Sequence, residues 1–282
     1  MPTLADAPIR TLDPGDLPPC LSLAADRDWP REEHKWRLLL DIGTGYGIED
    51  DAGDLVGSAI VTRYGHDVAV ISMVLVASRC ARQGIGRRLM THALRHAGTA
   101  SVQLHATTYG RPLYEKLGFR AVGATVTHLG VFRPAAGDPT VDVSRPALDT
   151  DLPAILATDA AAFGADRTQL ITRLPAIARQ LRVIERDGRI TGYAGAWPSV
   201  DNVVIGPVIA ADMGDAQALI AELATGVDGP VRLDLDARHE ALSSWAALRG
   251  VAPATRVSAM AYGAPLRGQR ERLYIPVMQA LG

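Results

Sequence analysis

The residues best suited to chemistry lie where an apolar segment gives way to a glycine-containing turn. Val68–Val76 is β-branched and apolar, which is typical of a buried central strand. A short polar loop follows, and Gly84 and Gly86 then precede a helical pattern. The first N–H groups of a helix have no partner within it, and with the helix dipole they favour an anion. Because glycines let a phosphate approach the backbone closely, this turn predicts a pyrophosphate-binding site.

Charge and spacing narrow the kind of phosphate site. Arg82, Arg87 and Arg88 add positive charge around the turn. The spacing is not that of a dinucleotide-binding fold, which needs a third glycine and a downstream acid. It is not a P-loop either, because no Gly-Lys-Ser/Thr follows. Taken alone, the Gly-Ile-Gly sequence would fit a plain tight turn equally well.

Two motifs give the turn a family context. Residues 82–89, RQGIGRRL, resemble the acetyl-CoA-binding motif of the GNAT N-acetyltransferases, Arg/Gln-x-x-Gly-x-Gly/Ala after a strand. Ala81 departs from that motif; the backbone contacts can survive this change, and Arg82 or Arg79 can supply the charge. Residues 113–119, LYEKLGF, resemble the family's Leu/Phe-Tyr-x-x-x-Gly-Phe segment, and the stretch before them is similar to a subgroup with two GNAT-like halves. The resemblance covers residues 8–130 by motif and 141–264 mainly by element order.

The resemblance implies acetyl-CoA as the cosubstrate. In the family, two neighbouring parallel strands splay apart, and the pantetheine arm lies between them. Here those strands would be Val68–Val76 and Ser101–Ala106. The tyrosine at the position of Tyr114 commonly protonates the departing thiolate, although a packed aromatic is the alternative. The cofactor-binding residues implied are Val74, Leu75, Val76, Arg82, Gln83, Gly84, Ile85, Gly86 and Arg87.

The general base is not assigned by the sequence. Acetyl transfer needs a neutral amine, so a base or a water chain must accept a proton. The central strand carries Ser72 but no carboxylate, and the nearest titratable side chains are only weak candidates. These candidates are His66, Asp67, Glu49 and His105.

The predicted elements of the first half run strand, two helices, hairpin, buried strand, helix, strand, helix and strand. They are Pro8–Leu12, a helix capped by Asp13 or Asp16 and ending near Ala25, Glu32–Leu40, Tyr46–Glu49, Leu55–Arg63, Val68–Val76, Gly84–Ala97, Ser101–Ala106, Arg111–Leu117 and Phe119–Leu129. The second half repeats this order. Its elements are Val141–Arg145, Leu152–Phe163, Arg167–Leu174, Leu181–Arg186, Ile190–Trp197, Val203–Ala210, Asp215–Ala224, Val231–Asp236, Ala241–Leu248 and Ser258–Gly263, with a tail, Gln269–Gly282, that is either a strand or a short helix.

Two sequence matches at one offset indicate an internal repeat. Asp16–Leu21 reappears as Asp151–Leu156, and Gly53–Gly57 reappears as Gly188–Gly192, in each case 135 residues later. We therefore expect an α/β (α+β) fold of two tandem GNAT-like domains. Each would be a mixed, mostly antiparallel sheet flanked by helices, with a splayed parallel pair. The expected division is residues 1–133, a Pro/Gly linker at 134–140, and residues 141–282.

The second half lacks the features that suit a phosphate. No basic glycine-rich turn follows Val203–Ala210, and Asp212 and Asp215 would place negative charge there. We expect this half to be a degenerate domain without a cofactor site. Trp197 and Pro198 either pack in the core, the favoured reading, or line a substrate pocket. Asp234, Asp236 and His239 are better explained by a strand end and a helix cap than by a metal.

Composition sets the remaining limits. The net charge is −2, and acidic and basic residues are interspersed. The sequence therefore has no basic stripe of the kind that nucleic-acid-binding proteins carry. No apolar run is long enough for a membrane helix, and no signal peptide is evident; with two cysteines, a cytoplasmic protein is expected. We expect direct acetyl transfer in a ternary complex to a primary amine of a small molecule, without a metal. A CoA-binding sensor or scaffold without turnover is the alternative, and a homodimer is left open.

Overall fold

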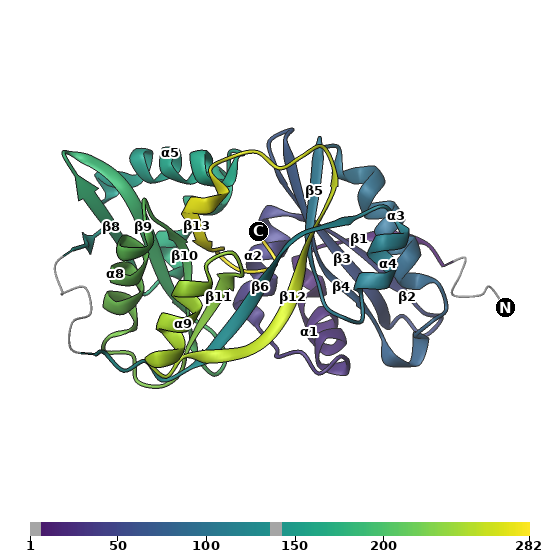
Figure 1. Cartoon of the computed structure of the whole chain (residues 1–282). Coiled ribbons are helices and arrows are strands. Elements are labelled where there is room, and N and C mark those ends of the chain that lie inside the picture. Colours follow the sequence, from purple (N-terminus) through teal and green to yellow (C-terminus); the bar gives the residue numbers. More distant parts are fainter. Residues whose placement is uncertain (1–6, 136–142) are drawn as a thin grey trace.

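The computed structural model describes residues 7–135 and 143–282 (Figure 1). Residues 136–140 of the expected linker, and the first two residues of the strand expected at Val141–Arg145, lie outside the described residues. The division into residues 1–133 and 141–282 stays a prediction. We call these two parts the first and second repeats.

The first repeat contains the elements that its sequence pattern predicts, with ends shifted by a residue or two. They are β1 (Ile9–Leu12), η1 (Pro14–Asp16), α1 (Leu17–Asp26), α2 (Glu33–Ile42), β2 (Thr44–Glu49), β3 (Leu55–Tyr64), β4 (Val68–Val76), η2 (Ser78–Cys80), α3 (Ile85–Ala97), β5 (Ser101–Ala106), α4 (Arg111–Lys116) and β6 (Arg120–Gly130). Asp13 caps η1, and α1 begins only after Asp16.

The second repeat follows the same order with four differences. Its elements are β7 (Arg145–Pro146), η3 (Asp149–Asp151), α5 (Leu152–Phe163), α6 (Thr168–Ile171), α7 (Leu174–Ile177), β8 (Gln180–Arg186), β9 (Arg189–Pro198), β10 (Val203–Ile209), α8 (Met213–Ala224), β11 (Val231–Asp236), α9 (Glu240–Leu248), β12 (Ala252–Gly263), η4 (Arg270–Arg272) and β13 (Leu273–Ile275). Of the strand expected at Val141–Arg145, only Arg145 is in a strand among the described residues, because Val143 and Ser144 form a bend. The helix expected at Arg167–Leu174 is two short helices, the last long strand begins six residues earlier than Ser258, and the tail holds both a helical turn and a strand.

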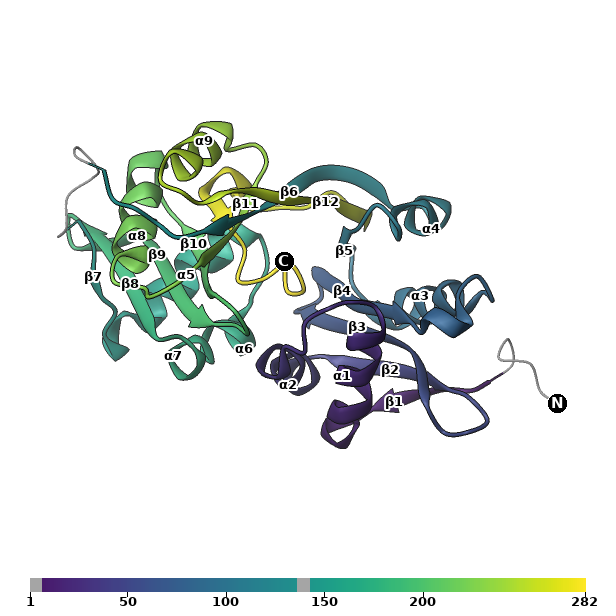
Figure 2. The same cartoon turned by 90° about the horizontal axis from the view of Figure 1, so that it is seen from below.

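The sheet exchanges its last long strands between the repeats. In the described part of the chain, the thirteen strands form one sheet in the order β1-β2-β3-β4-β5-β12-β6-β11-β10-β9-β8-β7, and β13 pairs with β10. Strand β12 of the second repeat therefore pairs with β5, and β6 of the first repeat pairs with β11. Figure 2 shows β6 and β12 running together from one repeat to the other, with the C-terminal segment beneath them. No pattern in the sequence predicted this exchange.

Strands β4 and β5 separate after three paired residues. Val68–Val70 pair in parallel with Ser101–Gln103, and no later residue of β4 is in register with β5. A bulge on the β3 side adds to the bend, since the register shifts between Ser58 and Ile60. Met73, in this bulge, has φ of +49°, and the hydroxyl of Ser58 donates to its carbonyl oxygen at 2.8 Å. The splayed parallel pair that the resemblance implied is therefore present.

The repeat is visible in side-chain contacts. Arg10 pairs with Asp16 and Glu49, and Arg145 pairs in the same way with Asp151 and Glu185. Two members of each cluster are separated by the 135-residue offset found in the sequence, and Gly53 and Gly188 both have positive φ, at +83° and +72°. In each repeat, an arginine of the first strand therefore joins the start of the first helix to the following hairpin through the same pair of ionic contacts.

The C-terminal segment lies between the two repeats and contacts both. The hydroxyl of Tyr64 donates to the carbonyl oxygen of Leu281 at 2.9 Å. Arg167 donates to the carbonyl oxygen of Gly282 at 2.8 Å and forms a fully buried, two-contact pair with Asp159. Groups from both repeats therefore fix the last residues of the chain. In the described residues, no helix is long and apolar enough to cross a membrane.

Candidate functional site

A cavity of about 530 Å³ lies where β4 and β5 diverge. We call it the strand-end cavity; its walls are the end of β4, the turn into α3, and α4. Of the site residues expected from the sequence, Gln83 is exposed on the turn and is not on the cavity wall. The others line it together: Val74, Leu75, Val76, Arg82, Gly84, Ile85, Gly86, Arg87 and Tyr114.

The start of α3 faces this cavity without a side-chain cap. Gly84 is the N-cap, in the left-handed region with φ of +83°, and no side chain satisfies the first N–H groups. A Cβ on Gly86 would meet only ordinary contacts, at 3.4 Å from Leu113 and 3.6 Å from Val76. The backbone N–H groups are therefore available to an anion, and the thirteen-residue helix adds its dipole.

The arginines of the turn divide into paired and available groups. Arg79 forms ion pairs with Asp50 and Asp54, so its charge is already neutralised. Arg82 and Arg87 are exposed, line the cavity and have no ion-pair partner among the residues that the structure describes. Of the two arginines considered as replacements for the motif position at Ala81, Arg82 is the one whose charge is free.

Tyr114 combines burial with an unengaged hydroxyl. The side chain is 7% exposed, and Gly110 packs against it so closely that a Cβ there would lie 3.2 Å from the hydroxyl oxygen. The hydroxyl makes no hydrogen bond within the described part of the chain. Burial raises the pKa of Tyr114 to about 12. At neutral pH the phenol therefore keeps its proton and can donate it to a group in the cavity.

Sequence patterns did not point to the segment that closes the cavity on its other side. The guanidinium of Arg27 lies 5.6 Å from the ring centre of Tyr109 and donates to the hydroxyl of Ser78 at 2.9 Å. Both Arg27 and Tyr109 line the strand-end cavity, as does Trp29. This connection between α1 and α2 has no periodicity, so only the folded chain shows that it belongs to the site.

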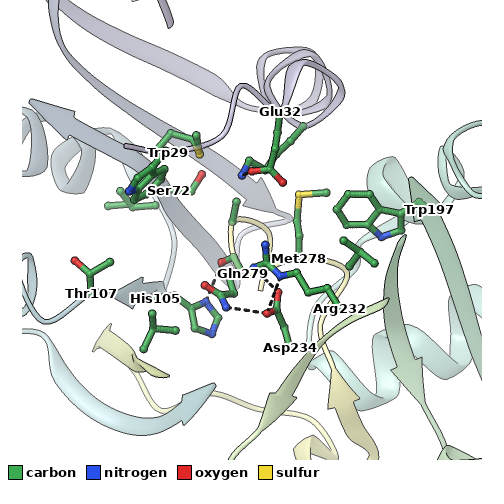
Figure 3. A pocket seen from close by; sticks show the side chains of 16 residues that line it. Trp29, Glu32, Ser72, His105, Thr107, Trp197, Arg232, Asp234, Met278 and Gln279 are labelled. Atoms are coloured by element: carbon green, nitrogen blue, oxygen red, sulfur yellow. Dashed lines mark hydrogen bonds and ion pairs between the residues drawn. The ribbon is translucent and has the colours of Figure 1, made fainter. Parts of the chain in front are cut away.

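A second cavity, of about 130 Å³, adjoins the first between the two repeats. We call it the inter-repeat cavity; Figure 3 shows Trp29, Ser72 and Thr107 on one side and Trp197 on the other. Trp29 and Thr107 line both cavities. Trp197 therefore lines a pocket while also being buried in the core, and its indole N–H has no partner, as is also true of the Ser72 hydroxyl.

Two carboxylates face the inter-repeat cavity, and they differ in how many hydrogen bonds they already accept. Asp234 accepts four hydrogen bonds at 2.6–3.1 Å, from Thr127, Gln279 and the Nε and Nη2 atoms of Arg232. Glu32 is 8% exposed, pairs with Lys35 and accepts from the hydroxyl of Ser199 at 3.1 Å. Glu32 therefore keeps capacity to accept a further hydrogen bond from a ligand.

The four candidates for the general base that the sequence offered differ in their position and in their contacts. Glu49 is held by Arg10, and His66 and Asp67 are exposed in the turn before β4, at the end opposite the strand-end cavity. His105 lines the inter-repeat cavity, but its ring nitrogens contact the carbonyl of Gln279 at 2.8 Å and the hydroxyl of Thr125 at 3.0 Å. Burial lowers the pKa of His105, so its ring is neutral and fully bonded.

The second repeat treats the corresponding helix start differently. Residues 77–84 connect β4 to α3, whereas only residues 210–212 connect β10 to α8. The carboxylate of Asp212 caps α8 by accepting from the N–H of Asp215 at 2.9 Å. Asp215 in turn pairs with Arg186. Carboxylates of the chain itself thus occupy the place that an anion would take at this helix start.

Comparison with known proteins identifies both halves. Two family models described as acetyltransferase (GNAT) domain match, one at residues 41–132 and the other at residues 155–275. A Bacillus subtilis (strain 168) protein described as uncharacterized N-acetyltransferase YitH is 28% identical over 266 residues, which is 93% of this chain and 94% of YitH.

Solved structures show the same fold over nearly the whole chain. A putative acetyltransferase from Pyrococcus horikoshii superposes with a TM-score of 0.81 at 19% identity, covering 98% of this chain and 95% of its own. A tandem GNAT protein from the clavulanic acid biosynthesis pathway has a TM-score of 0.65 at 15% identity, covering 92% and 100%. Because a GNAT acetyltransferase model matches each half of the sequence, the chain belongs to the GNAT family as two GNAT domains in tandem, and it is an acyl-CoA-dependent N-acetyltransferase.

Proposed function

We propose that the chain binds acetyl-CoA in the strand-end cavity and acetylates a primary amine of a small molecule held in the inter-repeat cavity. The observation that carries this proposal is that the two cavities share Trp29 and Thr107 at the splayed strands. Two ligands that meet there can react directly. The inter-repeat cavity, at about 130 Å³ and walled by both repeats, suits a small molecule better than a peptide chain.

The binding of the cosubstrate rests on complementary groups along the strand-end cavity. The uncapped start of α3, with Arg82 and Arg87, provides N–H groups and positive charge for a pyrophosphate. The end of β4 at Val74–Val76 is unpaired on the β5 side, which leaves an edge for the amides of the pantetheine arm. We propose a single such site per chain, because Asp212 already caps α8 in the second repeat.

The chemistry needs one proton acceptor and one proton donor. As the amine nitrogen bonds to the thioester carbon, the carbon–sulfur bond breaks and the thiolate leaves. We assign protonation of that thiolate to Tyr114, which is protonated at neutral pH, and the second proton that the nitrogen loses as the amide forms restores the Tyr114 phenol. We assign Glu32 to receive the acceptor's ammonium group and take up its proton, because its carboxylate is the less engaged of the two that face the inter-repeat cavity.

Direct transfer is favoured over an acyl-enzyme route. Cys80 lines the strand-end cavity and is the cysteine that could accept the acetyl group. Burial raises the pKa of Cys80, which reduces its thiolate fraction and hence its nucleophilicity. A ternary complex therefore fits the site better. Both cysteines are free and buried, which also accords with a reducing cytoplasmic location.

The proposal is tested by following thiol release from acetyl-CoA with a panel of small amines. Turnover with at least one amine, and initial-rate patterns that intersect when both substrates are varied, are expected for a ternary complex. Parallel patterns would indicate an acyl-enzyme instead. If CoA binds but no amine in a broad panel gives release above the hydrolytic rate, the assignment of a small-molecule acceptor is wrong.

A further inference from the structure

A third cavity, of about 300 Å³, is lined by His105 together with Val70 and Gln103, the last residue pair that joins β4 to β5. We call it the arginine cavity, because Arg270 and Arg238 line it together with Gln103. It shares His105 with the inter-repeat cavity but shares no residue with the strand-end cavity. The proposed acetyl transfer gives it no role.

Arg270 is a cation without a carboxylate partner. Its guanidinium donates to the amide oxygen of Gln103 at 3.2 Å and lies 4.6 Å from the ring centre of Phe163. Arg167 lies over the same ring at 4.1 Å, but Asp159 neutralises Arg167. Among the described residues, no carboxylate forms an ion pair with Arg270. A charge that is largely shielded from water and has no ion-pair partner is costly unless an anion compensates it.

Two buried N–H donors at this cavity have no acceptor. One is Nη2 of Arg270, and the other is Nε2 of Gln103, whose side chain is only 8% exposed. Buried donors in native proteins are normally satisfied, so a pair of unsatisfied donors at one cavity indicates an absent acceptor. Asp236 also lines the cavity, but its carboxylate is held by the side chain and the N–H of Arg238.

The lining defines the ligand. Arg238 and Asp236 pair with each other, and burial lowers the pKa of His105 so that its ring is neutral. Among the side chains that line the cavity, Arg270 is therefore the cation that no carboxylate of the described residues pairs with. A carboxylate presents two oxygens to such donors. Much of the remaining wall is apolar, and Val122, 53% exposed, leaves the cavity open to solvent. The apolar wall residues include Val70, Leu104, Met260, Leu266, Leu273 and Pro276.

We propose that the arginine cavity is a second ligand site, which binds a monocarboxylate with an apolar body through Arg270 and Gln103. The carboxylate accepts from Nη2 of Arg270 and Nε2 of Gln103, and the apolar body contacts the walls. The ligand is either a free carboxylic acid or the acid end of an acceptor molecule that reaches past His105. The chemistry of recognition is the same for both.

The test uses the full chain without acetyl-CoA or amine, so it does not depend on acetyl transfer. Benzoate is titrated by calorimetry and by its effect on Tm, with benzyl alcohol as the neutral probe of the same shape. Saturable binding of benzoate, at least tenfold tighter than that of benzyl alcohol, is expected. Equal weak responses to both probes would overturn the proposal.

Three variants locate the binding. Arg270→Met removes the charge and should weaken benzoate binding at least tenfold. Gln103→Glu places a carboxylate next to Arg270, so it should raise the Tm of the free protein and abolish the response to benzoate, even if Arg270→Met does not fold. Arg267→Gln, on the same loop with an exposed side chain, should bind like the wild type. Undiminished binding by Gln103→Glu would refute the site.

A final arm identifies the source of the carboxylate. The benzoate titration is repeated at saturating concentration of an amine that the enzyme acetylates. An unchanged Kd supports a separate ligand, whereas competition supports an acceptor that carries its own acid group. Both results require the arginine cavity, and they differ only in which molecule fills it.

Discussion

Replacing Tyr114 with Phe separates acid catalysis from packing. Tyr114 is buried, with its ring centre 6.1 Å from that of Phe119, and Phe keeps this contact. The hydroxyl has no hydrogen-bond partner in the described part of the chain, so its removal leaves no buried group unsatisfied. We therefore expect the free energy of unfolding of Tyr114→Phe to change by less than about 1 kcal/mol.

The effect on turnover should be much larger than the effect on stability. Proton transfer by a positioned side chain typically contributes about 10²–10⁴-fold. Because water can partly replace the phenol, we expect kcat to fall at least about tenfold, or about 1.4 kcal/mol in activation free energy. The Kd for acetyl-CoA should stay within about threefold, since protonation of the thiolate stabilises the transition state rather than the bound ground state.

The assay compares variants across acceptors and pH. Thiol release and CoA binding are measured for Tyr114→Phe and for Tyr109→Phe, which removes an exposed hydroxyl from the rim of the same cavity and should keep wild-type kcat. Because burial raises the pKa of Tyr114 to about 12, its ionisation should leave no inflection in the wild-type rate below about pH 10. Wild-type kcat for Tyr114→Phe with acceptors of every basicity would show that the tyrosine only packs.

Three further predictions test the other parts of the site and the fold. Gly86→Asp should remain folded and lose CoA binding by at least about hundredfold, because a carboxylate at this helix start repels a phosphate as Asp212 does in the second repeat; wild-type calorimetry should give one CoA per chain. Glu32→Gln should lower kcat/KM for the amine about 10²-fold with unchanged CoA affinity, and raising the pH should recover part of the loss as more amine becomes neutral. Arg167→Met should lower the free energy of unfolding in urea by about 3–5 kcal/mol, because it leaves the carboxylate of Asp159 buried without a cation; a loss under 1 kcal/mol would contradict that role.

Local sequence patterns predicted the parts of the candidate site that lie on one continuous segment. The turn at residues 82–87 could be recognised because the glycines, the arginines and the preceding strand are neighbours in the chain. The 135-residue repeat was visible for the same reason, since Asp16 and Asp151 each begin a helix after a short strand. Both features depend on backbone geometry that a few residues determine.

The parts that sequence could not reveal depend on distant contacts. Glu32 follows Pro30 in an irregular connection, and nothing in its neighbours indicates that it faces a cavity lined also by Trp197. The alternation in β6 and β12 predicts two strands, but it does not say which edge each one joins. Both β5 and β11 offer an edge to an antiparallel strand, and the choice is made by the fold as a whole.

The strand exchange gives a physical reason for keeping a second repeat that has no phosphate turn of its own. Strand β12 pairs with the edge of β5 that would otherwise be open, and β5 is the strand that diverges from β4. The second repeat also supplies Trp197 and Asp234 to the inter-repeat cavity, and Gln279 joins Asp234 to His105 of the first. A change in the second repeat can therefore alter the proposed acceptor cavity without touching the groups that we propose hold acetyl-CoA, so under this proposal acceptor choice and cofactor binding vary independently.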